Sequence, residues 1–170
     1  PPAGPDIDGN GRVDGFDLGL NYRLVSRQAG TFSFETTWAK LNSMYYNTAA
    51  GKPRTELLGT NNGATGGAAP KWRGNAQVNW RRGNWGAGLG AFYIGRFTVV
   101  GVTTNLATYE ALGRPSYIQP VFSSGNTTYR MVQPDTMTYN AFLSYQIRQS
   151  EKRSWLRDTK FRVGVNNLLN

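Results

Sequence analysis

Six runs along this chain alternate apolar and polar residues with a period of two, and the gaps between the runs are alternately short and long. A period of two is that of a β-strand, in which successive side chains point to opposite faces. Alternating gap lengths are typical of outer-membrane barrels, which place short turns on the periplasmic side and long loops outside. The sequence therefore predicts an all-β fold, an antiparallel up-and-down transmembrane β-barrel segment.

The expected strands span residues 13–25, 31–46, 71–80, 85–100, 136–148 and 159–170. An Asp/Gly-rich loop, 1–12, precedes a partial barrel, 13–170. Within that barrel we expect short turns at 26–30, 81–84 and 149–158, and long loops at 47–70 and 101–135. Six strands cannot close a membrane barrel, because the smallest closed ones have about eight. We therefore expect the chain to be part of a larger barrel.

The alternation also predicts which side chains face lipid and which face the barrel lumen. The run 71–80 has the cleanest pattern, and tryptophans stand near both of its ends, as in two aromatic girdles. A soluble β-sandwich would also alternate, but its loops need not alternate in length and its aromatic residues would cluster in one core. We expect Leu18, Leu20, Ala76, Val78, Leu143 and Tyr145 to face outward, and Asn21, Arg73, Gln77, Asn140 and Gln146 to face the lumen.

Composition excludes several function classes. The sequence has no run of about 18 apolar residues, so no transmembrane helix is expected. Histidine and cysteine are both absent, which removes the usual general base, thiolate metal sites and any disulfide framework. We therefore expect no catalytic residues and no enzyme. The net charge of +9 is spread through strands and turns without a dense basic tract, so we expect no nucleic-acid partner.

Three stretches resemble motifs in the C-terminal part of TonB-dependent outer-membrane receptors. Gly11–Tyr22 is similar to the strand opening "G-x-[DE]-L … Y". Pro70–Asn75, followed by Trp80 and Trp85, is similar to the hairpin "P-x-x-[KR]-x-N … W … G-x-W". Val163–Asn170 is similar to the signature "V-x-N-L-[FL]-[DN]" that precedes the last strand.

This resemblance implies about six strands of a 22-stranded barrel in the bacterial outer membrane. It implies energised uptake of a scarce nutrient, such as a metal chelate, a vitamin or an oligosaccharide. The implied partners are outer-membrane lipid, the remainder of the barrel, a plug domain, the ligand, and the TonB complex, which is reached through an N-terminal part that this sequence lacks. The long loops supply the expected ligand contacts, for which tyrosine and arginine are well suited: Tyr109, Arg114, Tyr117, Tyr129 and Arg130.

The segment 6–17 has the oxygen-ligand spacing of an EF-hand-type calcium loop, with Gly11 at the sharp turn. It leads directly into an expected strand, however, and an ordinary acidic turn would have the same pattern of residues. A dockerin-like spacing leaves open an alternative function, a secreted calcium-binding β-protein that acts as a binding module. The candidate Ca²⁺ ligands are Asp6, Asp8, Asn10, Arg12 through its carbonyl, Asp14 and Asp17.

Overall fold

The computed structural model describes residues 11–46, 55–62, 67–123, 125–147 and 159–169. The chain forms two compact units. Unit 1 contains residues 1–16, 39–73 and 94–136, and unit 2 contains residues 17–38, 74–93 and 137–170. The fold is almost entirely β, as predicted. Within the described residues, no helix is both long enough and apolar enough to cross a membrane.

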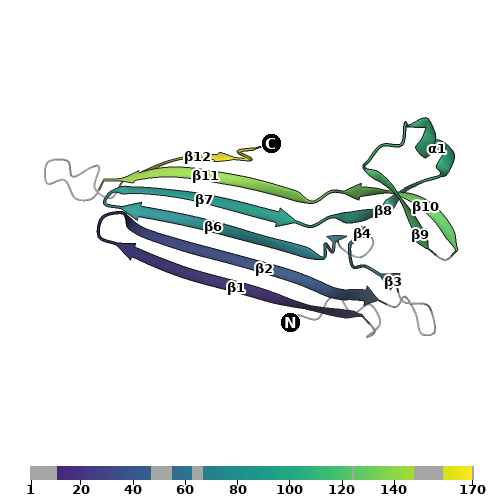
Figure 1. Ribbon diagram of the computed structural model, residues 1–170, viewed down its shortest axis with the longest axis horizontal. Helices are drawn as coiled ribbons and strands as arrows, with labels where there is room; N and C mark the ends of the chain where they lie inside the picture. The colour runs from purple at the N-terminus through teal and green to yellow at the C-terminus, as the bar shows by residue number, and fades with distance from the viewer. Residues whose placement is uncertain (1–10, 47–54, 63–66, 124, 148–158, 170) are drawn as a thin grey trace. The chain divides into compact units, whose positions relative to one another are not determined.

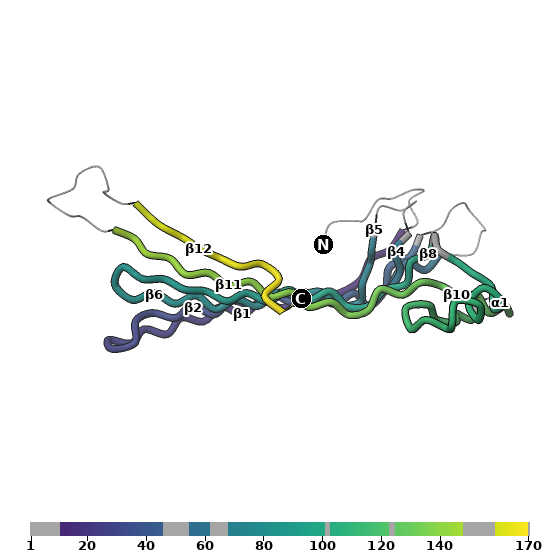
Figure 2. The backbone as a smooth tube through the Cα atoms, turned by 90° about the horizontal axis from the view of Figure 1, so that it is seen from above, coloured from purple at the N-terminus to yellow at the C-terminus, as the bar shows by residue number. Residues whose placement is uncertain are grey.

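The larger sheet has the strand order β1-β2-β6-β7-β11-β12, so each long strand pairs with its neighbours along the chain (Figure 1). Figure 2 follows the same strands along the backbone. The pairing of β11 with β12 is antiparallel, from Asn140 opposite Asn166 to Gln146 opposite Lys160. The strands are β1 (Arg12–Ser26), β2 (Gly30–Tyr46), β6 (Trp72–Arg82), β7 (Trp85–Ile94), β11 (Thr136–Gln146) and β12 (Lys160–Asn166), and the short β3 (Thr55–Glu56) also pairs with β2.

Unit 1 holds a second sheet, with the order β5-β4-β8-β10-β9. Its strands are β4 (Thr60–Asn62), β5 (Gly67–Ala68), β8 (Phe97–Thr104), β9 (Ile118–Ser123) and β10 (Asn126–Gln133), and the helix α1 (Leu106–Ala111) follows β8. The Asn105 side chain caps this helix by accepting a hydrogen bond from the backbone N–H of Thr108, at 2.8 Å.

The two stretches that we expected to be long loops contain regular structure of their own. Residues 47–70 include β3, β4 and β5, whereas 101–135 include the end of β8, then α1, β9 and β10. The fourth expected strand, 85–100, is also divided between β7 and β8. The division falls at Gly95, whose backbone N–H donates to the Trp72 carbonyl, and an added Cβ there would lie 3.0 Å from that carbonyl oxygen.

The larger sheet has one apolar and one polar face. Leu18 and Leu20 of β1 are each 60% exposed, and Leu143 of β11 is 51% exposed. On the opposite face, the Gln77 amide donates a hydrogen bond to the Glu35 carboxylate. Among the described residues, the buried apolar side chains are Leu57, Ala69, Ile118 and Val132, all of which belong to unit 1. The apolar face in unit 2 therefore has no protein core to cover it.

Aromatic rings on this apolar face pack on neighbouring strands. The indole of Trp38 lies over Gly74, where an added Cβ would approach its ring to 2.5 Å. The same indole N–H donates to the Thr36 hydroxyl at 2.9 Å, and the ring lies 5.8 Å from that of Tyr93. Each such aromatic pair contributes about 0.5–1.5 kcal/mol beyond its buried area. The lack of a side chain at Gly74 therefore leaves the space that the Trp38 ring occupies.

The turn end of unit 2 carries further aromatic contacts. Trp85 and Tyr145 pack edge to face at 4.8 Å. The indole N–H of Trp80 donates to the carbonyl of Ala29, at 2.7 Å, and so joins the β6–β7 hairpin to the β1–β2 turn. Trp80 and Trp85 flank one short turn, which is the arrangement that the sequence predicted for an aromatic girdle.

We expect Gly74→Ala to destabilise the protein because the new methyl group displaces the Trp38 indole. Overpacking of this kind costs about 1–3 kcal/mol. The free energy of unfolding in urea, measured for the protein in lipid vesicles, tests this. Gly19→Ala is the matched control, because nothing lies within 4 Å of a Cβ at Gly19. Equal stability of the two variants would contradict the role given to Gly74.

The facing of the strands is testable with single cysteines, since the chain has none of its own. We expect Leu20→Cys to react with a lipid-soluble maleimide and Asn21→Cys to react with a charged, membrane-impermeant one. The reason is that adjacent strand residues point to opposite faces. Labelling in intact outer membranes measures this, and the reverse preference would show that the apolar face is an interior core.

Candidate functional site

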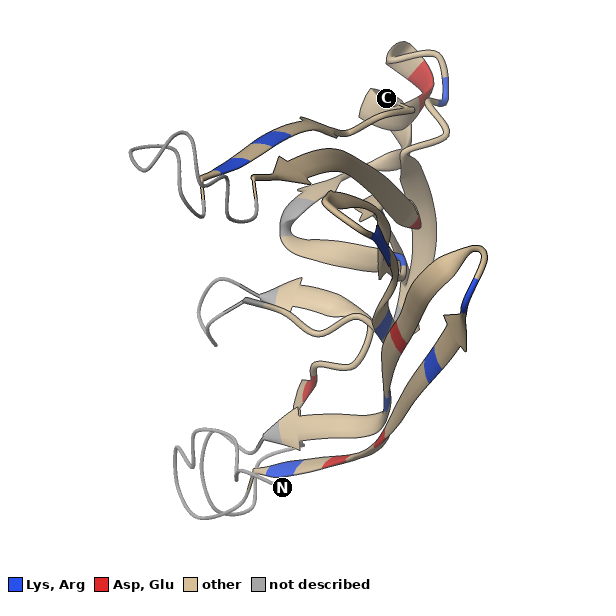
Figure 3. Ribbon diagram, turned by 90° about the vertical axis from the view of Figure 1, so that its left-hand side faces the viewer, with Lys and Arg blue, Asp and Glu red and all other residues tan. Residues whose placement is uncertain are grey.

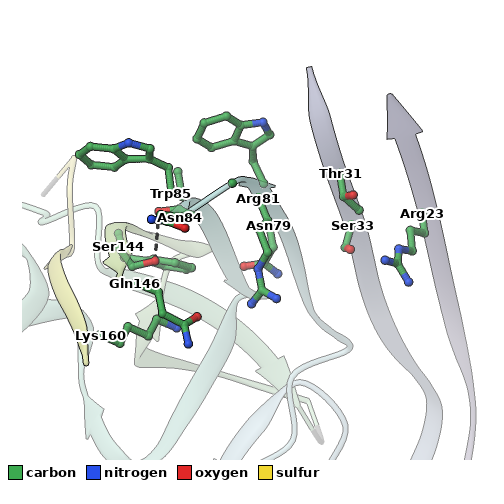
Figure 4. Close-up of a pocket in the computed structure, with 15 residues that line it drawn as sticks. Arg23, Thr31, Ser33, Asn79, Arg81, Asn84, Trp85, Ser144, Gln146 and Lys160 are labelled. Atoms are coloured by element: carbon green, nitrogen blue, oxygen red, sulfur yellow. Dashed lines mark hydrogen bonds between the residues drawn. The ribbon is translucent and has the colours of Figure 1, made fainter. Parts of the chain in front are cut away.

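A hollow of about 430 Å³ lies on the polar face of unit 2 (Figure 4). Three cations line it: Arg23 from β1, Arg81 from β6 and Lys160 from β12. The residues that line it include no aspartate or glutamate. The neutral polar side chains that line it are Thr31, Ser33, Asn79, Asn84, Ser144 and Gln146.

Strand alternation and glycine create this hollow. The side chains of Ser144 and Gln146 lie on one side of the sheet and the ring of Trp85 lies on the other (Figure 4). The Ser144 hydroxyl donates to the Gly86 carbonyl at 3.2 Å, and it occupies the space that a Cβ at Gly86 would need. Phe142 occupies the corresponding space at Gly88. Both glycines therefore allow a side chain of β11 to approach the backbone of β7 closely.

The cations of this hollow stand far apart across the sheet. Arg23 lies on one edge strand and Lys160 on the other, with four strands between them. The guanidinium of Arg162, on the same strand as Lys160, lies over the Phe142 ring at 3.8 Å from its centroid. The surface is therefore a broad, positively charged wall. No lining side chain forms a nucleophile–base pair, and charged groups on a water-filled barrel wall are expected without catalysis.

Unit 1 holds a smaller hollow, of about 200 Å³, whose lining includes Arg96, Tyr117, Gln119 and Asp135. The Arg96 guanidinium donates to the Gln119 amide oxygen at 2.7 Å. The Arg96 backbone N–H donates to the Asp135 carboxylate at 2.8 Å. Tyr117 is 51% exposed beside these groups. The hollow thus combines an aromatic surface, an amide, a guanidinium and a carboxylate, which is a set that binds polar ligands.

Of the five residues predicted to contact ligand, the structure groups Tyr109, Arg114 and Tyr129 together and places Tyr117 at a hollow. Tyr117 lines the unit 1 hollow. Tyr109 of α1 stacks on Tyr129 of β10, with ring centroids 4.7 Å apart. Arg114 donates to the Glu110 carboxylate, and this hydrogen bond, with the charge of Glu110, raises the pKa of Arg114 above its ordinary value. The Nε atom of Arg130 is buried without a hydrogen-bond partner.

The candidate calcium ligands fall in two parts of the chain. Asp6, Asp8 and Asn10 lie outside the described residues. Arg12, Asp14 and Asp17 lie in β1, where alternation places Asp14 and Asp17 on opposite faces of the strand. Within the described part of the chain, no group of three or more acidic residues is placed to hold a metal ion. Calcium binding stays a prediction.

Sequence reasoning missed Arg96, Gln119 and Asp135. Arg96 and Asp135 are 39 residues apart, and neither belongs to a motif. The available signal was the Gly95-Arg96 break in an otherwise regular strand, because a conformational break beside a charged residue often marks a site.

A protein-family model described as "TonB dependent receptor-like, beta-barrel" matches residues 5–168. The chain belongs to this family. No significant match was found among curated proteins or among solved structures. The match confirms the family predicted from the three sequence motifs, and it gives no support to a secreted dockerin-like binding module.

TonB-dependent receptor barrels are outer-membrane receptors and transporters, not enzymes. In general they work with a plug domain, TonB and a ligand. The exposed apolar face of unit 2 agrees with contact to lipid, and the polar face agrees with a water-filled lumen. Figure 3 shows how few charged residues the strands of this TonB-dependent receptor barrel carry.

Proposed function

We propose that this barrel takes part in energised uptake of a scarce nutrient, and that the nutrient is a neutral, hydroxyl-rich oligosaccharide. The observation that carries the choice is the hollow of unit 1, where an exposed Tyr117 ring stands beside Gln119, Arg96 and Asp135. Uptake by such a receptor would depend on TonB and on a plug domain.

The chemistry of the unit 1 hollow favours an oligosaccharide over a metal chelate or a vitamin. Its one guanidinium and one carboxylate leave little net charge, so it suits an uncharged ligand better than an anionic metal chelate. A tyrosine ring packs against the apolar face of a sugar, and amide and carboxylate oxygens accept hydrogen bonds from its hydroxyl groups. A largely apolar vitamin would offer these polar groups no further hydrogen bonds in place of the water that it displaces.

The remaining predicted contacts act on this hollow indirectly. The Tyr109–Tyr129 stack fixes α1 against β10, and Arg130 stands directly opposite Gln119 in the β9–β10 pairing. The side chains of Tyr109, Tyr129 and Arg130 therefore hold the wall that carries Gln119, while Tyr117 makes direct contact with the ligand.

The test is accumulation of fluorescently labelled neutral oligosaccharides by cells that make this receptor, with and without TonB. We expect TonB-dependent accumulation, and about tenfold weaker oligosaccharide binding for Tyr117→Ala, because a central aromatic contact contributes more than about 1 kcal/mol. Phe122→Ser is the control. Phe122 lies on the same strand as Gln119 and is 76% exposed, but it does not line the hollow.

Each result has a separate meaning. Accumulation that persists without TonB would contradict energised uptake. Unchanged binding by Tyr117→Ala would reject the hollow as the contact site. Accumulation of ferric chelates in place of sugars would overturn the ligand class and leave the receptor function standing.

A further inference from the structure

We propose that Lys40, Phe16 and Trp72 form a binding site for the phosphate headgroup of a membrane lipid on the apolar face of the larger sheet. The Lys40 ammonium nitrogen lies 5.7 Å from the centroid of the Phe16 ring and 5.3 Å from that of Trp72. The two rings pack edge to face at 6.2 Å. All three residues belong to unit 1.

A lysine at this position is unusual for the strand that carries it. Residues with even numbers in β2 include Phe32, Phe34 and Trp38, so alternation places Lys40 on the apolar face with them. β2 continues through Lys40 as one strand, and the lysine lies beside the rings of Phe16 and Trp72. No ion pair of Lys40 occurs among the residues that the structure describes.

Two aromatic faces hold the charge without neutralising it. A cation over a ring gains about 0.5–1 kcal/mol at an exposed site, which fixes the ammonium in place but leaves its N–H donors available. Phe16 is half exposed, and Trp72 is exposed to a similar degree, so the rings present apolar surface beside the charge. The cluster therefore offers one fixed cation and an apolar rim.

This combination matches the headgroup region of a lipid better than a free anion. Trp72 is the first residue of β6 and Trp80 is near its last, which is the spacing in sequence expected of residues at two aromatic girdles. Lysine is a compact point charge suited to phosphate. Indole and phenyl rings at this level pack against the upper part of an acyl chain, whereas free phosphate has no apolar part.

Two charged residues of β1 lie on the same face close to Phe16 in sequence. Alternation in β1 places Arg12 and Asp14 on the side of Phe16. Their charges have opposite signs, so the excess positive charge of this rim comes from Lys40. Removing Lys40 is therefore the decisive change.

The experiment measures how many lipids stay bound to the receptor, purified in detergent from outer membranes and supplied with defined lipids, by native mass spectrometry. The lipids are phosphatidate, which has a phosphomonoester headgroup, and phosphatidylcholine, which is zwitterionic. Lys40→Gln removes the cation and Lys40→Arg keeps it. Arg73→Gln is the matched control, because it removes one cation beside Trp72 but from the opposite face of β6.

We expect Lys40→Gln to lower phosphatidate retention about fivefold, the effect of one basic residue near an anionic surface. Lys40→Arg and Arg73→Gln should retain phosphatidate like the unmodified protein, and phosphatidylcholine retention should not change. An equal loss in Arg73→Gln would reject the site in favour of a general charge effect. Full retention by Lys40→Gln would also overturn the proposal.

The unmodified protein gives an independent reading in case Lys40→Gln does not fold. We expect phosphatidate in mixed micelles to raise its thermal unfolding temperature more than phosphatidylcholine does. Inorganic phosphate alone should not raise it. Stabilisation by inorganic phosphate to the same extent would indicate a free-anion site and would reject a lipid site.

Discussion

Among the described residues of unit 2, no protein core covers the apolar faces of the long strands, and the larger sheet follows from this constraint. In lipid, each backbone N–H and C=O must be satisfied within the sheet, because no water is present to replace a missing hydrogen bond. Each long strand of the ladder β1-β2-β6-β7-β11-β12 pairs with its neighbours and leaves Leu18, Leu20 and Leu143 directed away from protein. Lipid then serves as the core that a soluble domain would build from side chains.

The same constraint explains why the sequence was informative about the larger sheet. A strand between lipid and water has to alternate strictly, and the run from Trp72 to Trp80 does so without exception. The pairing within each hairpin followed, because short turns can only join neighbouring antiparallel strands. The contacts of the glycines could not be predicted from the alternation. That Trp38 fills the space over Gly74 depends on the register between β2 and β6, which alternation alone does not specify.

The second sheet escaped prediction because lipid does not constrain it. Its strands are short, and the register of the β8–β10 pairing shifts between Arg130 and Met131. The parallel pairing of Thr60 with Thr98 joins segments that are distant in sequence, and no local pattern indicates it. The same applies to the hollow of unit 1. Tyr117 was predictable from its residue type, whereas Asp135 accepts a hydrogen bond from the Arg96 backbone N–H, whose position the fold determines.

The hydrogen bond from the Trp80 indole to the Ala29 carbonyl joins parts of two hairpins that are 51 residues apart in sequence. This bond exists only when the two hairpins lie side by side. Indole emission responds to hydrogen bonding and to the polarity around the ring. Trp80 is consequently a built-in optical reporter of hairpin association, and a protein in which Trp80 is the sole tryptophan would reveal when during barrel assembly neighbouring hairpins meet.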